Sequence, residues 1–585
     1  MSQLINESLE ESGVFTDHNY QGSNITAINQ TLSYVFSVMM MHLNQTSTET
    51  MFTESQLYEN MSRLVKEIGY SPIGFQTSTL TFSASAGGID AGLYTIPRYS
   101  SITIGGLAYS FNEDITFAKL VDSVVESLDD MSREKLLYQG KFVEHPTKIA
   151  SGTDNELMYL AVDSTQPIDH FNVHVYVKQG DGIWRQWTST QSLYLQTAND
   201  LQYELRLNEN RRYELQFGNN INGRKLNEGD EVAVYYLRSD GSEGAVGAGV
   251  LSQQKVIAFD STRFADISSD FESSQFQRLT TAELKTSMSF TNSRASTYAA
   301  EGDDVANIRE NAPGVYRSQF RLVTAGDYVS FIKTNFANIV QDATVVNNST
   351  YVNEYLKYFY DMGLMDPHKT SRALFNQVDY ADACNFNNMY AFIVPKSLTQ
   401  FNSRISQISP ALRELVINTV REEKIATSET IIMDPVYVSC DIAVPAGNTA
   451  KVSDVGESEL VVVEESNSRR DQQSIRNDIK SIIEDYFSRQ NTKLGQLINV
   501  NQMTSDFLAV DGVKSVYSRN KSNGVTVEGL SLLAWNQAYS DNDIQHVTKN
   551  IRLPFFKATF WHSPDALLSK IVMESSTRSG EQVEN

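Results

Sequence analysis

This chain has few cysteines, and its sequence shows neither an apolar leader nor an apolar run long enough to span a membrane. Its 585 residues include two cysteines, Cys384 and Cys440, which favours free thiols in a reducing compartment over a disulfide framework. Residues 1–13 are acidic without an apolar stretch, unlike a signal peptide. The most apolar run, residues 32–43, is shorter than a bilayer-spanning helix requires. We expect a protein that folds in a cytoplasm and has no membrane partner.

Positive charge is also scarce. Lys and Arg number 48 against 71 Asp and Glu, which gives a formal net charge of −23. DNA and anionic lipid surfaces attract clustered Lys and Arg, whereas the nearest candidates here are the pairs Arg211–Arg212 and Arg224–Lys225. These counts argue against nucleic acid as a partner.

The rest of the composition is that of a large globular chain. Hydrophobic residues make up 41% and charged residues 20%, and the length suggests about two to four domains. The apolar patterns predict a multidomain α+β protein with an N-terminal helical bundle arm, a β-rich middle domain and two tandem C-terminal α+β domains. The expected parts are a flexible arm at 1–23, a bundle-forming helical region at 24–70, a β-rich domain at 71–265, a linker or insertion at 266–300, α+β domains at 301–430 and 431–570 (the second for ring or dimer contacts) and a tail at 571–585.

Residues 23–52 have the apolar spacing of a long helix with an exposed seam, because apolar side chains recur at alternating steps of three and four. The pattern Thr53-x-x-Gln56 then predicts a capping box for a second helix, which ends at Gly69. We expect seven side chains of this region to bury against helices of other subunits: Ile25, Ile28, Leu32, Val35, Met39, Leu57 and Met61.

The middle of the chain has short runs of β-branched and aromatic residues between Gly, Asn and Asp, which indicate strands. One helical interruption is expected near residues 118–137. The predicted strands are at 79–85, 93–99, 172–178, 193–196, 213–217 and 231–237.

The second half alternates strand and helix patterns. Thr324 is expected to cap a helix that begins at Ala325, with Asp327 in its first turn, where negative charge suits the helix dipole. The other predicted elements are strands at 339–346, 389–394, 436–444, 513–517 and 524–533, and helices at 398–424, 473–488 and 501–508.

The segment Gly218–Leu226, GNNINGRKL, has the glycine spacing of a phosphate-binding loop but not its chemistry. Arg224 stands where the phosphate-binding Lys belongs, and Lys225 replaces the magnesium-binding hydroxyl. A strand rather than a helix is expected next, so we interpret the glycines as a β-hairpin turn that binds no nucleotide.

Other candidate sites are equally incomplete. His170 and His174 share a strand face near Asp169, but a third metal ligand is not evident, and ordinary strand histidines explain them better. The acidic pairs Asp303–Asp304 and Glu422–Glu423 fit surface solvation better than glycoside hydrolysis. Neither a GxSxG elbow nor a nucleophile signature is present. We therefore expect no enzyme and no catalytic, cofactor or metal residues.

Four stretches together resemble one family. Residues 22–72 contain a long helix, a short helix and a Gly-Tyr-x-Pro exit into strands, and residues 94–111 resemble the pattern "IP.G..f....Y.F" with Tyr99 at the usual glycine. Residues 213–249 match "FG.g.nG..p..G..v.v.Y..t.G..gn". Residues 308–332, followed by a segment from Asp434, match "iR..ap......R.vT..Dy" and "dP.y..v.v.v". These patterns resemble the baseplate J-like wedge proteins of contractile-tailed, T-even-type bacteriophages.

The resemblance implies a non-enzymatic structural subunit of a viral tail baseplate. Two copies of such a subunit pair within each wedge, their helices bundle with another wedge protein, and wedges join into a ring around the central hub. The ring couples host contact to sheath contraction. The implied partners are the protein itself, other wedge proteins, the hub and sheath-proximal proteins, and the implied location is the virion, after assembly in the host cytoplasm.

Two other functions remain as alternatives. A tail adhesin that binds a receptor would be β-rich and often repetitive, whereas this chain shows no internal repeat and has an α/β second half. A tail-borne cell-wall hydrolase would need a catalytic pair of carboxylates. Binding to cells or glycans would favour the first alternative, and activity on peptidoglycan the second.

Overall fold

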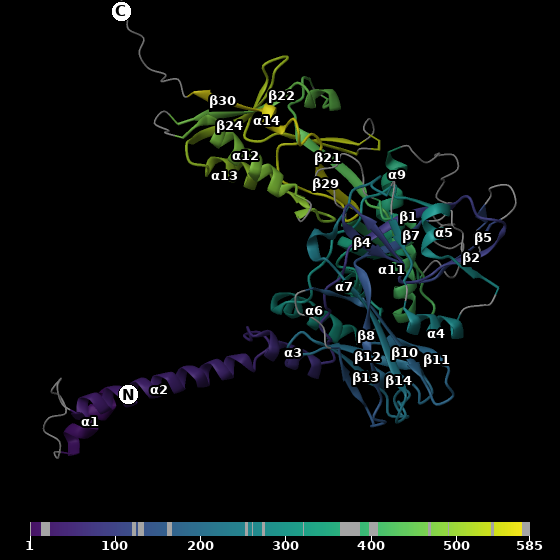
Figure 1. Cartoon of the computed structure of the whole chain (residues 1–585). Helices are drawn as coiled ribbons and strands as arrows, with labels where there is room; N and C mark the ends of the chain where they lie inside the picture. Colours follow the sequence, from purple (N-terminus) through teal and green to yellow (C-terminus); the bar gives the residue numbers. More distant parts are fainter. Residues whose placement is uncertain are drawn as a thin grey trace, which may run out of the picture.

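The structure is a computed structural model, and it confirms a mixed α+β architecture with an extended N-terminal arm (Figure 1). The chain begins with α1 (Ser2–Ser12), which lies at the far end of α2 (Asn24–Glu49), and α3 (Tyr58–Glu67) joins α2 to the body. The described residues are 2–12, 24–119, 125–126, 134–160, 166–251, 255–259, 261–271, 275–319, 321–362, 387–396, 407–447, 449–465, 470–488, 491–536, 538–539 and 543–575.

The two predicted N-terminal helices are present, but the chain start and the second helix cap differ from expectation. Residues 2–12 form a helix within the segment expected to be an aperiodic arm. Thr53 does not cap α3, whose N-cap position is Leu57 without a side-chain cap. The Glu49 carboxylate accepts the backbone N–H groups of Gln56 and Leu57 instead, each at 3.2 Å, so the cap comes from the preceding helix. Gly69 ends the helix with φ +87°, as predicted.

The β-rich middle contains three sheets (Figure 1). Their strand orders are β15-β3-β4-β7-β1-β17, β8-β14-β10-β11-β12-β13-β9 and β16-β2-β5-β6. Alternate side chains of these strands fill apolar cores within the β-rich part. The bounds are β1 Thr79–Ala86, β2 Gly92–Ile96, β3 Ser101–Ile104, β4 Leu107–Ser110, β5 Ile115–Lys119, β6 Val125–Glu126, β7 Lys135–Gln139, β8 Lys141–Ile149, β9 Leu157–Tyr159, β10 Ile168–Lys178, β11 Trp184–Thr190, β12 Gln202–Leu207, β13 Tyr213–Phe217, β14 Glu231–Arg238, β15 Lys255–Ile257, β16 Gln277–Arg278 and β17 Met288–Thr291.

Two predictions in this part are wrong over the described residues. The expected helix at 118–137 is replaced by strands, because β5 pairs with β2 and β7 pairs with β1, and sheet pairing overrides local helix propensity. Residues 193–196 form a 3₁₀ turn, Leu193–Leu195, rather than a strand.

The segment 266–300 was expected to be a linker or an insertion, and it is not a linker, because it packs as part of the β-rich body. It contains the end of α4 (Thr262–Phe271), α5 (Thr281–Ser287) and β17, which pairs antiparallel with β1. The segment is rich in Ser and Thr, but the apolar side chains that anchor it are almost fully buried: Ile267, Leu279, Leu284 and Phe290.

The C-terminal half has the predicted alternation of helices and strands, except that the strand expected at 524–533 is two strands, at 526–528 and 532–536, with Gly529 at φ +74° between them. Thr324 caps α7 (Ala325–Asn335) as predicted, and Asp327 completes a capping box by accepting the backbone N–H of Thr324. The helix expected at 398–424 is described only as α11 (Pro410–Glu423), and residues 397–406 lie outside the described part. Further bounds are α6 Val305–Ser318, β18 Val340–Asn347, β19 Met389–Pro395, β20 Thr430–Met433, β21 Val436–Ile442, β22 Ser458–Glu464, α12 Gln472–Tyr486, α13 Val500–Leu508, β24 Val513–Asn520, β25 Thr526–Glu528, β26 Leu532–Asn536, β27 Ile544–Val547, β29 Lys557–Trp561, α14 Leu567–Lys570 and β30 Ile571–Ser575.

Four further sheets are described in this half. One is the pair β23 (Leu497–Ile498) and β28 (Ile551–Arg552), and the other three have the orders β18-β19-β20, β27-β26-β21-β29 and β25-β24-β22-β30. The helices α12 and α13 cover the last sheet (Figure 1). Their apolar faces include Ile479, Ile483 and Phe507, which are buried in the largest core of the molecule. An ion pair between Lys570 and Asp441, with 2.7 Å between Nζ and Oδ1, links α14 to β21 inside this part.

Candidate assembly surfaces

The helix α2 is the most apolar exposed element described. Its 26 residues include one charged side chain, Glu49, at the C-terminal end. At 1.5 Å per residue it is about 39 Å long, and it projects away from the body (Figure 1). An isolated surface helix normally places charged residues on its outer face. The composition of α2 is therefore that of a helix covered by partners.

The predicted seam is exposed along α2. The exposed fractions are 59% for Ile28, 54% for Leu32, 48% for Val35 and 57% for Met39. The side chain of Ile25 lies outside the described part. Other large apolar side chains of α2 are exposed as well, and they widen the surface beyond the seam: Tyr34, Phe36, Met40, Met41 and Leu43.

The two seam residues of α3 behave differently. Leu57 is 52% exposed and stays available to a partner. Met61 is fully buried in its own chain, in a cluster with Val65, Tyr70 and Ile308. The prediction that Met61 packs against another subunit is wrong, because α6 of the same chain already covers this side chain. The sequence alone could not reveal that a helix about 250 residues later in the chain packs on this face.

A second apolar patch lies where two loops of the seven-stranded sheet meet. Tyr194 is 78% exposed, Leu195 is 75% exposed and Ile221 is 74% exposed. The two loops pack against each other, because a Cβ on Gly223 would lie 2.9 Å from Leu193 Cδ2. We refer to these three side chains as the loop patch.

The segment Gly218–Leu226 forms the loop between β13 and β14, not a hairpin turn, because these two strands pair with other strands. The strand β14 follows it, so a helix N-terminus is missing where a phosphate would bind. Lys225 Nζ is 2.6 Å from Asp154 Oδ1. The tight part is Gly218, where a Cβ would lie 2.2 Å from the Gly223 carbonyl oxygen. These observations favour a structural loop.

The two strand histidines make separate hydrogen bonds. His170 Nδ1 accepts the Gly74 N–H at 3.2 Å, whereas His174 Nδ1 lies 2.7 Å from the Tyr99 hydroxyl. Burial lowers the pKa of His170 to about 4 and that of His174 to about 3. The Asp169 carboxylate is bound to Thr77 N, at 2.6 Å. Among the described residues there is no group of three or more His, Cys, Asp or Glu side chains that could hold a metal.

The acidic pair at 303–304 has structural contacts. Asp303 accepts the Tyr70 hydroxyl at 2.6 Å and the Ile73 N–H at 2.9 Å, and burial raises its pKa. Asp304 caps α6 by accepting the Asn307 N–H at 2.7 Å. In the other pair, burial raises the pKa of Glu423. These contacts give Asp303 and Asp304 structural roles.

The described cysteine, Cys440, gives no sign of reactivity. Cys440 is buried in β21, and burial raises its pKa. Cys384 lies outside the described residues, so its pairing stays a prediction. Within the described part, none of the helices is both long and apolar enough to cross a membrane.

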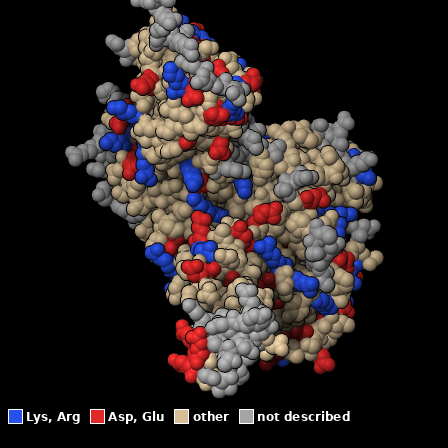
Figure 2. All heavy atoms as spheres, turned by 90° about the vertical axis from the view of Figure 1, so that its left-hand side faces the viewer, with Lys and Arg blue, Asp and Glu red and all other residues tan. Residues whose placement is uncertain are grey.

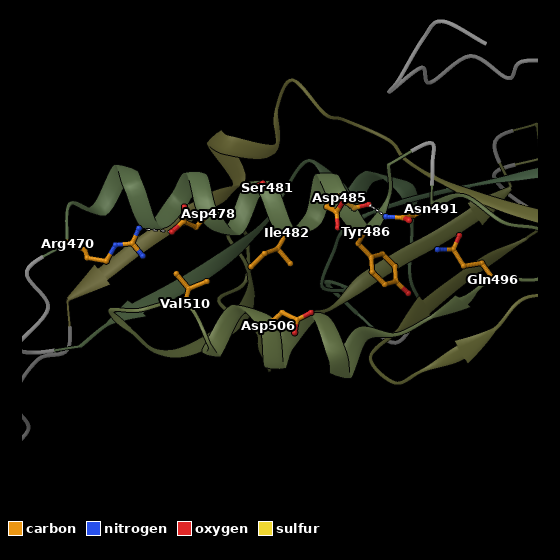
Figure 3. A pocket seen from close by; sticks show the side chains of 10 residues that line it. All are labelled: Arg470, Asp478, Ser481, Ile482, Asp485, Tyr486, Asn491, Gln496, Asp506 and Val510. Atoms are coloured by element: carbon orange, nitrogen blue, oxygen red, sulfur yellow. Dashed lines mark hydrogen bonds and ion pairs between the residues drawn. The ribbon is translucent and has the colours of Figure 1, made fainter. Parts of the chain in front are cut away.

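The charged surface is mixed in sign. On the face in Figure 2, Lys and Arg side chains are interspersed with Asp and Glu. A groove of about 680 Å³ lies between α12 and α13, and its lining includes Ile482 of α12, which points toward α13, and Val510 (Figure 3). Asp485 and Asp506 also line it, and Arg470 at one end pairs with Asp478 at 2.7 Å.

Comparisons with known proteins give remote structural likeness only. No family model and no curated protein matches the sequence. A chain of the anti-feeding prophage baseplate is 11% identical over 93% of this chain and 92% of that chain, with a TM-score of 0.28. A chain of the type VI secretion system TssK-TssF-TssG baseplate subcomplex is 7% identical over 69% of this chain and 96% of that chain, also with a TM-score of 0.28. At these scores the likeness carries no argument about function.

Proposed function

We propose that this chain is a structural, non-enzymatic subunit of a contractile-tail baseplate, where it serves as a wedge protein. The observation that carries the assembly role is the exposed, nearly uncharged α2. Five of the seven predicted seam side chains are about half exposed, and burying them in a helical bundle would stabilise a complex. We infer that α2 bundles with a second copy and with another wedge protein.

The backbone supports the sequence resemblance at the positions that the family patterns reserve for glycine. Tyr99 and Asn220 stand at two such positions, and their φ angles are +65° and +63°. Gly223, Gly229 and Gly241 also have positive φ. Because positive φ favours glycine, the patterns mark a backbone conformation that this chain keeps even where glycine is replaced.

Tyr99 shows how the chain tolerates this replacement. Its side chain is 1% exposed and its ring lies 4.4 Å from that of Phe142 and 5.3 Å from that of Tyr235, measured between centroids. Its hydroxyl is 2.9 Å from that of Tyr176. A left-handed non-glycine residue costs about 1–3 kcal/mol, which burial of an aromatic ring offsets.

We place the ring-closing contacts in residues 301–585, because a helical bundle around α2 can join only the few chains of one wedge and a closed ring needs further surfaces. The groove between α12 and α13 is a candidate surface. Cutting the chain at residue 300 cannot test this proposal, because α6 covers Met61 and Val65. Charge reversal at side chains that line the groove should keep the fold intact, because Asp485 is exposed and Asp506 is only partly buried. The variant Asp485→Lys with Asp506→Lys should form wedges but fail to close rings. Rings of normal yield from this variant would remove the groove from the proposal.

Assembly with other wedge proteins tests the proposed function itself. The full chain should co-purify with them, and negative-stain microscopy should show wedges. Tight binding of the isolated chain to cells or glycans, without wedge formation, would favour an adhesin.

A further inference from the structure

The corner between α2 and α3 is held by one carboxylate. Glu49 is the last residue of α2 and α3 begins at Tyr58, so eight residues separate them. An ionised carboxylate can accept about four hydrogen bonds, and Glu49 accepts four from the N-terminal side of α3. The donors are Ser55 Oγ at 3.0 Å, Gln56 N at 3.2 Å, Leu57 N at 3.2 Å and Asn60 Nδ2 at 3.2 Å.

The same corner is attached to the body. An Arg309 guanidinium N–H of α6 donates to the Ser55 carbonyl at 2.6 Å. Met61 and Val65 of α3 are fully buried against α6, and Phe52 packs on the same cluster. Arg63 Nε lies 3.2 Å from Glu209 Oε1, which joins α3 to the turn between β12 and β13. The C-terminal end of α2 is therefore held through the connection and α3, which contact two different parts of the body.

The segment that follows α3, residues 73–79, continues through the centre of the molecule. Its backbone and side chains make hydrogen bonds with elements that are far apart in sequence, from β10 to α7. The bonds are Ile73 N to Asp303 at 2.9 Å, Gly74 N to His170 at 3.2 Å, Gln76 Nε2 to the Thr334 carbonyl at 3.1 Å, Thr77 N to Asp169 at 2.6 Å, Asn338 Nδ2 to the Thr77 carbonyl at 2.7 Å and Thr79 N to Thr297 at 2.9 Å.

We propose that α2, α3 and residues 73–79 form one rigid lever, in which Glu49 fixes the joint and residues 73–79 carry any displacement of α2 into the body. A flexible eight-residue connection would leave α2 as a tether that moves without affecting the body. The hydrogen-bonded joint instead makes the orientation of α2 and the packing around residues 73–79 depend on each other. This inference goes beyond the proposed function and concerns the free chain, so it can fail or hold independently.

The joint is tested by the distance between spin labels on α2 and on the body of the full chain. Suitable label positions are the exposed residues Ser37 and Asn210, changed to Cys in a Cys384→Ser background. Dilution with unlabelled chain removes intermolecular distances. We expect one narrow distance distribution, which Glu49→Ala broadens at least twofold while circular dichroism shows unchanged helix content. The matched control Glu54→Ala, an exposed residue of the same corner, should keep the distribution narrow.

The transmission is tested by hydrogen exchange on the full chain. The variant Asn338→Ala removes the bond to the Thr77 carbonyl. We expect amide exchange to rise about fivefold or more at Thr77 and also at Met61 in α3. A rise in amide exchange that is confined to the neighbourhood of residue 338 would show that residues 73–79 do not couple the body to α3. A narrow distance distribution in the Glu49→Ala variant, or a broad one in the chain with Glu49 intact, would show that Glu49 does not hold a rigid joint.

Discussion

Placing one negative charge on the α2 seam should abolish assembly without unfolding the protein. Five described seam side chains (Ile28, Leu32, Val35, Met39 and Leu57) are 48–59% exposed. Full burial of such a side chain is worth about 1.5–3 kcal/mol, so burying the exposed half of five contributes about 4–8 kcal/mol per chain. The variant Ile28→Asp loses about 1 kcal/mol of this and brings a carboxylate into an apolar interface at a cost of several kcal/mol. Affinity should therefore fall about 100-fold or more.

The assay for this variant is co-purification with wedge partners, with affinity measured by titration. The melting temperature of the isolated chain should stay nearly unchanged, because exposed positions usually alter the free energy of unfolding by less than about 0.5 kcal/mol. The control Gln30→Asp introduces the same charge in α2 outside the seam. Normal affinity of Ile28→Asp, or an equal loss of affinity for both variants, would show that the seam of α2 is not the interface.

Three other changes have expected outcomes. Gly74→Ala should lower the free energy of unfolding by about 1–3 kcal/mol, because its Cβ would lie 2.0 Å from the Tyr213 hydroxyl, whereas Gly87→Ala meets nothing within 4 Å and should be neutral in denaturant titrations. The pKa of His170 is lowered from 6.5 to about 4, so the unfolded chain binds more protons than the folded chain between these pH values. The free energy of unfolding should therefore fall as pH decreases from 6.5 to 4, by about 2 kcal/mol after allowance for partial exposure of the ring. His170→Gln should flatten that pH dependence, and an unaltered slope would contradict the assignment. Calorimetry should show no micromolar ATP binding to the chain, and Lys225→Ala should not alter assembly.

The elements that sequence patterns predicted correctly are those whose signal is local and periodic. The helix α2, the N-cap at Thr324 and the strand β14 each carry their own spacing of apolar or capping residues. The failures share a different cause. The segment at 266–300 looked like a linker because few of its residues are apolar, yet those few, such as Phe290, bury against distant strands.

The candidate assembly surface was also predicted only in part. The exposed seam of α2 follows from periodicity, but the period alone cannot say which partner covers which residue, and Met61 faces α6 of its own chain. The role of Glu49 was missed, because a cap supplied by the end of the preceding helix has no fixed spacing in the sequence. A lone carboxylate at the end of an otherwise uncharged helix was the available signal.

If this chain is a baseplate subunit whose α2 is enclosed by helices of other subunits, both features should be visible by cryo-electron microscopy of contractile tail particles purified from cells that make the protein. We expect the chain in the baseplate, with Leu32 and Met39 buried among helices of neighbouring chains. Particles that lack the chain, or that contain it with α2 facing solvent, would show that it is not such a subunit.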